Sequence, residues 1–120
     1  PRRLLLIAKT TDGCPVGQIR FDQQSLSPEE TFNHAVIAIS LDRCARGHGL
    51  ASEIVRTGLN VMQEHWGSAI NVIAEVLPNN TASNATFARA GFKPIAKMES
   101  SPLSFLPQKN RWLWTSSKSL

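Results

Sequence analysis

The chain has 120 residues, of which 42% are hydrophobic and 18% are charged, a length and composition typical of one globular domain and not of a disordered chain. No apolar run approaches the roughly 20 residues that a membrane-spanning helix needs, so we expect no membrane partner. The 13 Lys and Arg against 9 Asp and Glu give a net charge of +4. These charges are scattered, so they do not predict a nucleic-acid partner.

The N-terminal residues and the cysteines indicate the compartment. Arg2 and Arg3 precede an apolar stretch that is too short for a secretory signal peptide. The 2 cysteines, Cys14 and Cys44, are too few for a disulfide framework. We therefore expect a cytoplasmic protein.

The first third of the chain predicts an antiparallel hairpin followed by a central strand. Residues 3–9 form an apolar run of strand length, and the Asp-Gly pair at 12–13 indicates a turn. Residues 17–22 alternate polar and apolar side chains, as a returning strand does. The polar segment 23–33 predicts a loop, and the apolar segment 35–41 predicts a strand at the centre of a sheet.

The rest of the chain alternates predicted helices and strands. Residues 49–65 carry apolar side chains on one helical face, with Ser52 on the wet side, and residues 69–77 predict a second core strand. A short helix over 81–90 and closing strands over 93–99 and 111–116 complete the chain. The order β-β-β-α-β-α-β-β predicts one α/β (α+β) domain over residues 1–120. Its mixed, mostly antiparallel sheet carries the helices on its surface.

The segment between the central strand and the long helix has the residue types of an anion site. The first N–H groups of a helix lack intrahelical partners, and the helix dipole places about half a positive charge there. Gly47 and Gly49 let a ligand approach the backbone, and the guanidinium of Arg46 suits phosphate oxygens. A diphosphate pocket is one interpretation, and a tight strand-to-helix turn is the other.

Two motifs on these elements carry a resemblance to a known family. Arg46-x-x-Gly49-x-Ala51 resembles the acyl-CoA-binding motif of the GNAT superfamily of N-acetyltransferases. A second signature of that superfamily is similar to a pattern that follows about thirty residues later, namely Glu75-Val76-x-x-x-Asn80-x-x-Ser83-x-x-x-Phe87-x-x-x-Gly91-Phe92. The resemblance covers roughly residues 2–116.

The resemblance implies the acyl-CoA N-acyltransferase fold, with acetyl-CoA as the acyl donor. In that fold the parallel strands at 35–41 and 69–77 splay apart, and the pantetheine arm enters between them. It implies the following cofactor-binding residues: Ile39 and Leu41 through their main chain, the N–H groups of Arg46, Gly47, His48, Gly49, Leu50 and Ala51 on the pyrophosphate, and Asn80, Ser83 and Phe87 along the arm. For Asn80 and Ser83, helix capping is an equally good interpretation.

The resemblance also implies catalytic residues. Glu75 matches the glutamate that some members use as the general base, and its place in a core strand predicts partial desolvation. A solvated or salt-bridged glutamate is the alternative. Many members have Tyr where this chain has Phe87, and the chain contains 0 Tyr. Ser83 is our candidate for the missing acid, with Ser40, Cys44 or a water as alternatives.

The acceptor is the least defined feature. Family members have an extra strand and helices that wall the acceptor site, and this chain lacks that section, as a fragment or the C-terminal domain of a longer protein would. We expect an amino sugar or another small-molecule amine, with a protein or peptide N-terminus as the alternative. A non-catalytic acyl-CoA-binding module is the competing class. No metal is expected, because Cys44 and His48 have no second ligand pair. The expected macromolecular partner is a second copy of the chain, in a homodimer, or the rest of a longer chain.

Overall fold

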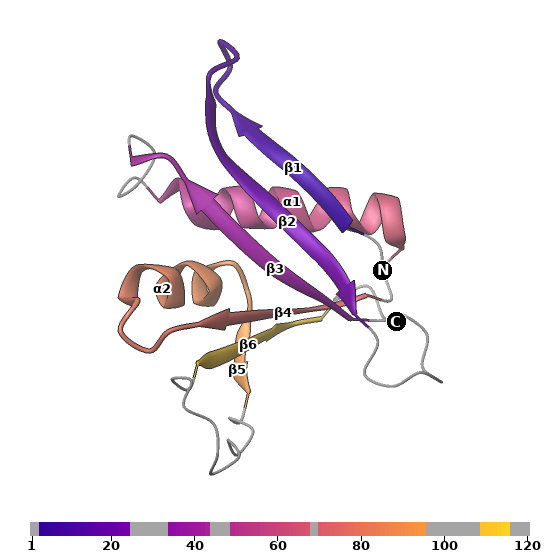
Figure 1. The fold of residues 1–120 in the computed structure, drawn as a ribbon, viewed down its shortest axis with the longest axis vertical. Helices are drawn as coiled ribbons and strands as arrows, with labels where there is room; N and C mark the ends of the chain where they lie inside the picture. The colour runs from indigo at the N-terminus through magenta and orange to yellow at the C-terminus, as the bar shows by residue number, and fades with distance from the viewer. Residues whose placement is uncertain (1–2, 25–33, 44–48, 68–69, 96–108, 116–120) are drawn as a thin grey trace.

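The computed structural model describes residues 3–24, 34–43, 49–67, 70–95 and 109–115 (Figure 1). Within these ranges the elements follow the predicted order. They are β1 (Arg3–Lys9), β2 (Pro15–Gln24), β3 (His34–Leu41), α1 (Leu50–Trp66), β4 (Asn71–Val76), α2 (Thr81–Arg89), β5 (Lys93–Ile95) and β6 (Asn110–Trp114). The loop predicted over 23–33 begins later than expected, because residues 23–24 belong to β2. Its residues 25–33, and the later part of the strand predicted at 93–99, lie outside the described residues. No helix within the described ranges is long and apolar enough to cross a membrane.

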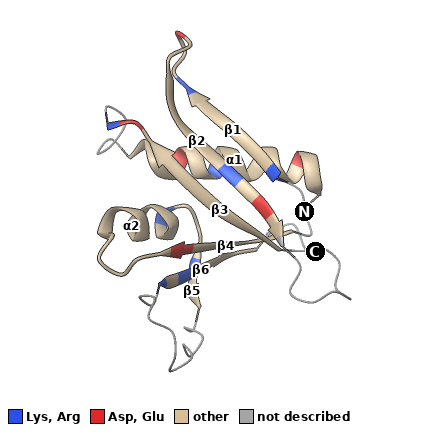
Figure 2. Cartoon of the chain, viewed as in Figure 1, with Lys and Arg blue, Asp and Glu red and all other residues tan. Residues whose placement is uncertain are grey.

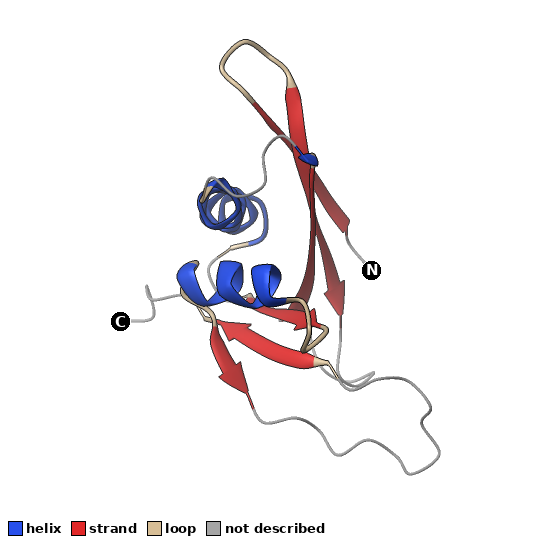
Figure 3. Ribbon diagram, turned by 90° about the vertical axis from the view of Figure 1, so that its left-hand side faces the viewer, coloured by secondary structure: helices blue, strands red, loops and turns tan. Residues whose placement is uncertain are grey.

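The strands form one sheet in the order β1-β2-β3-β4-β6-β5. The pair β3 and β4 is parallel, and the other neighbours are antiparallel. Both helices lie on one side of this sheet (Figure 3), with α1 against β1 and β2, and α2 against β4, β5 and β6. The predicted α/β architecture with a mixed, mostly antiparallel sheet is confirmed.

The core lies between the sheet and the two helices. The largest fully buried side chains come from β2, α1 and β4; they are Ile19, Phe21, Val55, Leu59, Met62 and Val72. Gly58 lets α1 approach β2 closely, because a Cβ atom at this position would lie 2.8 Å from Cδ1 of Ile19. The other face of β1 carries Leu5 and Ile7, which are exposed.

The parallel strands β3 and β4 pair only at their beginnings. Their register runs over three residue pairs and ends at Val36 and Ile73. Beyond that point β3 continues to Leu41 beside β2, and β4 continues to Val76 beside β6. The two strands therefore diverge towards their carboxyl ends (Figure 1), which confirms the predicted splayed pair.

Candidate functional site

The carboxyl half of β3 presents main-chain groups where β4 has turned away. The amide of Asp42 donates to the carbonyl oxygen of Val16 in β2, over 2.8 Å. Consecutive residues of a strand point their main-chain groups to opposite sides. The amides and carbonyls of Ile39 and Leu41 therefore point to the side from which β4 has departed, as the resemblance implies for a pantetheine-binding strand.

The start of α1 has no side-chain cap. Gly49 occupies the N-cap position with φ of 71° in the left-handed region, and as a glycine it has no side chain to accept from the first-turn amides. Ser52 instead donates its Oγ hydrogen to the carbonyl oxygen of Gly49, over 3.3 Å. A Cβ on Gly49 would meet nothing within 4 Å. Among the described residues, the first turn of α1 thus receives no cap from its N-cap residue, and space is open beside Gly49, which is the arrangement that an anion site needs.

A groove of about 630 Å³ lies between the end of β3, the start of α1 and α2. It is lined by Ile39, Ser40, Leu41, Gly49, Ala51, Ser52, Asn80, Thr81, Ala82, Ser83, Ala85, Thr86 and Arg89. The structure thus brings together six of the predicted site residues: Ile39, Leu41, Gly49, Ala51, Asn80 and Ser83.

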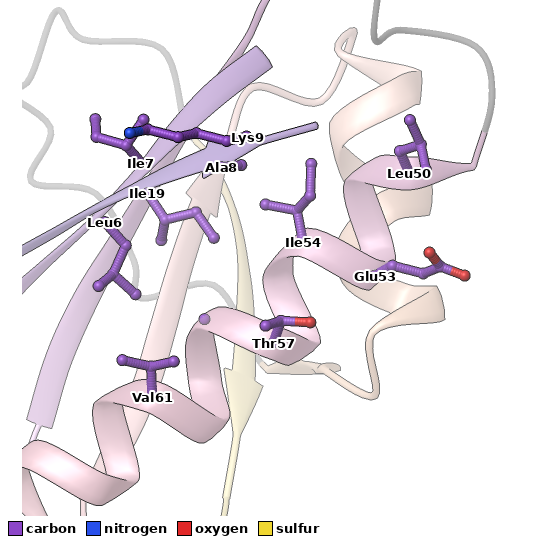
Figure 4. A pocket seen from close by; sticks show the side chains of 11 residues that line it. Leu6, Ile7, Ala8, Lys9, Ile19, Leu50, Glu53, Ile54, Thr57 and Val61 are labelled. Carbon is purple, nitrogen blue, oxygen red and sulfur yellow. The ribbon is translucent and has the colours of Figure 1, made fainter. Parts of the chain in front are cut away.

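Other predicted cofactor residues do not line this groove. Phe87 lies in the core, 3% exposed, where its ring packs edge to face on Phe92 with centroids 5.1 Å apart. Leu50 turns its side chain to a different hollow of about 420 Å³ between β1 and α1 (Figure 4). Only the main chain of Leu50 belongs to the uncapped helix start. Arg46, Gly47 and His48 lie outside the described residues.

Asn80 caps α2. Its Oδ1 accepts a hydrogen bond from the amide of Ser83, over 3.2 Å. The capping interpretation of these two residues is therefore confirmed. Since the cap uses only Oδ1, the Nδ2 group of Asn80 keeps its capacity to donate to a ligand in the groove.

Asn84 holds this end of α2 in place. Its Nδ2 donates to the carbonyl oxygens of Leu77 and Asn80, over 3.2 and 2.9 Å. Its Oδ1 accepts from Trp112 Nε1 at 2.8 Å and from Asn110 Nδ2 at 3.3 Å. Asn84 thereby ties the turn after β4 to strand β6. Sequence reasoning missed this residue; an Asn inside a predicted helix, where it is a poor helix former, was the available signal.

The sequence also did not predict that Ser52 and Arg89 line the groove. Ser52 was expected on the solvent-facing side of α1, but it is buried, with 7% of its surface exposed. Its short side chain is tolerated there because Oγ finds an acceptor in the preceding turn. Arg89, in the last turn of α2, is the one basic side chain among the described residues that line the groove. Its carbonyl oxygen accepts from Nη2 of Arg56, over 3.1 Å.

Glu75 lies on the sheet face away from the helices. Neighbouring Ala74 and Val76 are buried under α2, and strand alternation turns Glu75 the other way. Its Oε1 lies 3.5 Å from Nη2 of Arg111, its register partner on β6, and the two side chains are 35% and 31% exposed. The salt-bridged alternative is therefore confirmed, and the partial desolvation of Glu75 stays a prediction. Within the described ranges, no group of His, Cys, Asp and Glu could hold a metal ion.

Comparison with solved structures shows the fold. The GNAT domain of S. lividans PAT matches with a TM-score of 0.72 and 23% identity, over 93% of this chain and 60% of that one. An aminoglycoside acetyltransferase in complex with coenzyme A matches with 0.74 and 18%, over 94% and 66%. The ribosomal-protein-S5-alanine acetyltransferase from Vibrio fischeri matches with 0.68 and 17%, over 89% and 57%.

These identities are low, and the chain spans only about 60% of the length of the PAT domain structure. No curated protein matches the chain. The family model described as "Acetyltransferase (GNAT) domain" matches residues 2–93, which is more than half of the chain. The groove, the splayed strands and this match agree, and the chain belongs to the GNAT acetyltransferase family.

Proposed function

We propose that this chain is an acetyl-CoA-dependent N-acetyltransferase that moves an acetyl group to a primary amine. The observation that carries the proposal is that the uncapped start of α1 and the outward-facing main chain of β3 border one groove. Amides at a helix start suit a pyrophosphate, and a strand edge suits the amide groups of a pantetheine arm. The groove therefore fits the donor substrate of the family.

The groove residues divide by the part of the donor that they would hold. The amides of Gly49, Leu50 and Ala51, with Arg46, Gly47 and His48, bind the pyrophosphate. The main chain of Ile39 and Leu41 pairs with the arm. Asn80 and Ser83 lie across the groove from β3 and donate hydrogen bonds to the arm, and Arg89 adds a cation for the phosphates.

The bound donor supplies an acetyl thioester, and residues of the chain accept one proton and donate another. The amine nitrogen forms a bond to the acetyl carbon, and the carbon–sulfur bond breaks. Glu75 accepts the proton that the amine loses. Ser83 donates a proton to the departing sulfur, a role that the Phe87 ring cannot fill. A thiol with an ordinary pKa near 8.5 is already a tolerable leaving group, so this proton contributes less than a positioned acid usually does.

The acceptor is a small-molecule amine such as an amino sugar, with a protein N-terminus as the second candidate. The structurally similar proteins include an aminoglycoside acetyltransferase and a ribosomal-protein-alanine acetyltransferase, so the fold accommodates both classes. A non-catalytic acyl-CoA-binding module is the competing function, and the core position of Phe87 and the ion pair of Glu75 favour it. The cytoplasmic location and the oligomeric state stay predictions.

Thermal unfolding with acetyl-CoA tests the donor site. At about 100 times the Kd, binding should stabilise the fold by about 2.7 kcal/mol, which raises Tm by several degrees. No shift at millimolar acetyl-CoA would refute both acyl-CoA functions.

Glu75→Gln separates the enzyme from the binding module. The enzyme predicts an unchanged Kd and a kcat that falls by about 10²–10⁴. The matched control is Glu64→Gln, an exposed glutamate of α1, which should change neither. Acetyl-CoA binding without turnover of any amine would support the binding module.

A further inference from the structure

Three charged side chains share the helix-free face of the sheet where β4, β6 and β5 lie side by side. Glu75 on β4 is the register partner of Arg111 on β6. Lys93 on β5 is the partner of Leu113, two residues further along β6, so Lys93 and Arg111 lie diagonally across about 7–8 Å. Figure 2 shows the acidic segment of β4 beside a basic segment of β6. This cluster of Glu75, Arg111 and Lys93 has two cations and one anion.

The ion pair inside the cluster is loose. The distance of 3.5 Å between Nη2 of Arg111 and Oε1 of Glu75 exceeds the ~2.7–2.9 Å of a tight charge-assisted hydrogen bond. Both side chains are partly exposed, and such surface pairs contribute little to stability. The planar guanidinium of Arg111 therefore keeps donors for a second anion, and it can leave Glu75 at small cost.

The cluster lies beside the interval where the sheet opens. Glu75 belongs to the part of β4 that no longer pairs with β3. On the other side of that interval, Ile39 and Ser40 of β3 line the groove. Among the described residues of β4, Glu75 is the carboxylate that an amine placed at this interval would face.

The excess positive charge of the cluster argues against a simple amine. An acceptor that arrives as an ammonium ion is attracted by Glu75 but repelled by Arg111 and Lys93. An acceptor that also carries a carboxylate, phosphate or phosphonate reverses that balance, because its anion pairs with the two cations while its nitrogen faces Glu75. Arginine is the side chain best suited to such oxyanions, since it can donate two parallel hydrogen bonds.

We propose that the acceptor is an amine with an anionic group a few bonds from its nitrogen, and that Arg111, assisted by Lys93, binds that anion. This inference rests on the proposed function, in which Glu75 takes the amine proton. Arg111 shifts its donors from Glu75 to the acceptor anion. The ammonium group gives one proton up to solvent and a second to Glu75 as its nitrogen bonds to the acetyl carbon. The carbon–sulfur bond breaks, the departing sulfur is protonated through Ser83, and the product is an anionic N-acetyl amide.

Matched acceptors test the proposal in the full chain. Glycine, β-alanine and 2-aminoethylphosphonate are compared with glycinamide, β-alaninamide and ethylamine, by the rate of thiol release from acetyl-CoA. We expect kcat/KM to be higher for the anionic members by roughly 10- to 100-fold, the range for hydrogen bonds to a charged group. Arg111→Gln should remove this preference mainly through KM, and Arg111→Lys should restore part of it.

A matched control and a binding measurement exclude a merely structural effect. Arg20 also lies on the helix-free face, in an ion pair with Asp22 at 3.0 Å, and Arg20→Gln should leave the preference unchanged. Calorimetric titration of N-acetyl-β-alanine into the CoA-saturated protein should show binding that Arg111→Gln weakens. The same titration with N-ethylacetamide should show no dependence on Arg111.

Three results would overturn the proposal. They are equal or better turnover of the amines that lack an anionic group, no turnover of any amine that carries one, or an equal loss of kcat/KM for both classes in Arg111→Gln. The failure of the proposed function has a different signature. If amines without an anionic group are acetylated independently of Arg111, the proposed transferase function is supported and only the acceptor inference fails. If the wild-type protein does not bind acetyl-CoA, both fail.

Discussion

The four side-chain hydrogen bonds of Asn84 give the sharpest quantitative prediction, and Asn84→Ala removes all four. The bonds to Asn80 at 2.9 Å and from Trp112 at 2.8 Å are well formed, and those to Leu77 at 3.2 Å and from Asn110 at 3.3 Å are longer. A typical intramolecular hydrogen bond contributes about 0.5–1.5 kcal/mol. Counting the short bonds near 1 kcal/mol each and the long ones near half, the loss is about 3 kcal/mol.

Two effects reduce that figure. Ala is a better helix former than Asn by roughly half a kcal/mol, and water can reach part of this site because Trp112 is only half-buried. The net destabilisation should be about 1.5–2.5 kcal/mol. For a chain of 120 residues this corresponds to a decrease in Tm of roughly 5–12 °C.

Urea denaturation at equilibrium, with unchanged m-value, measures this loss. Asn79→Ala is the matched control, because Asn79 is exposed and lies in the same turn; it should cost less than about 0.5 kcal/mol. Trp112→Phe removes one of the four bonds and should cost about 1 kcal/mol beyond its smaller buried area. If Asn84→Ala is as stable as Asn79→Ala, the hydrogen bonds do not hold the turn, and our account of how Asn80 and Ser83 are positioned fails.

Three further predictions concern single residues. Gly49→Ala should cost about 1–2 kcal/mol because of its φ of 71°, and should weaken acetyl-CoA binding in calorimetry, whereas an unchanged Kd would refute the helix-start site. Phe87→Tyr should destabilise by about 1–3 kcal/mol, since it buries a hydroxyl beside Phe92, and should not raise kcat; a raised kcat would place this ring at the reaction. The Thr10 hydroxyl, and then main-chain hydrogen bonds, lower the pKa of Asp12 from 3.8, so its small stabilisation is present above that pH and lost as the pH falls below it; a carboxyl NMR titration with a midpoint at or above 3.8 would contradict this.

The sequence predicted the elements and their order because periodicity and turn residues act locally. The hairpin, the central strand, both helices and the two closing strands all appear where the pattern indicates them, with ends that move by one or two residues within the described ranges. Ser52 was misassigned because its hydroxyl suggested a solvated position. Its hydrogen bond to Gly49, which the pattern does not reveal, permits its burial.

The features of the candidate site that lie within a single segment could be predicted from the sequence. The glycine at the start of the helix and the Asn-x-x-Ser cap are local features, and Gly49, Asn80 and Ser83 meet in the groove as expected. The main-chain groups of Ile39 are available because two strands diverge. The resemblance to a family, not the composition of either strand, predicted that divergence.

Only the tertiary structure decided which face of the sheet Glu75 takes and which distant side chains meet. Glu75 faces away from the helices because its neighbours fill the core, and its partner Arg111 comes from a strand 36 residues later. Asn84 bonds to Trp112 across 28 residues. Local pattern sets the conformation of each segment, whereas the sheet register sets which distant groups meet. That register depends on the packing of the whole core, so the pairing of these residues could not be derived from the sequence alone.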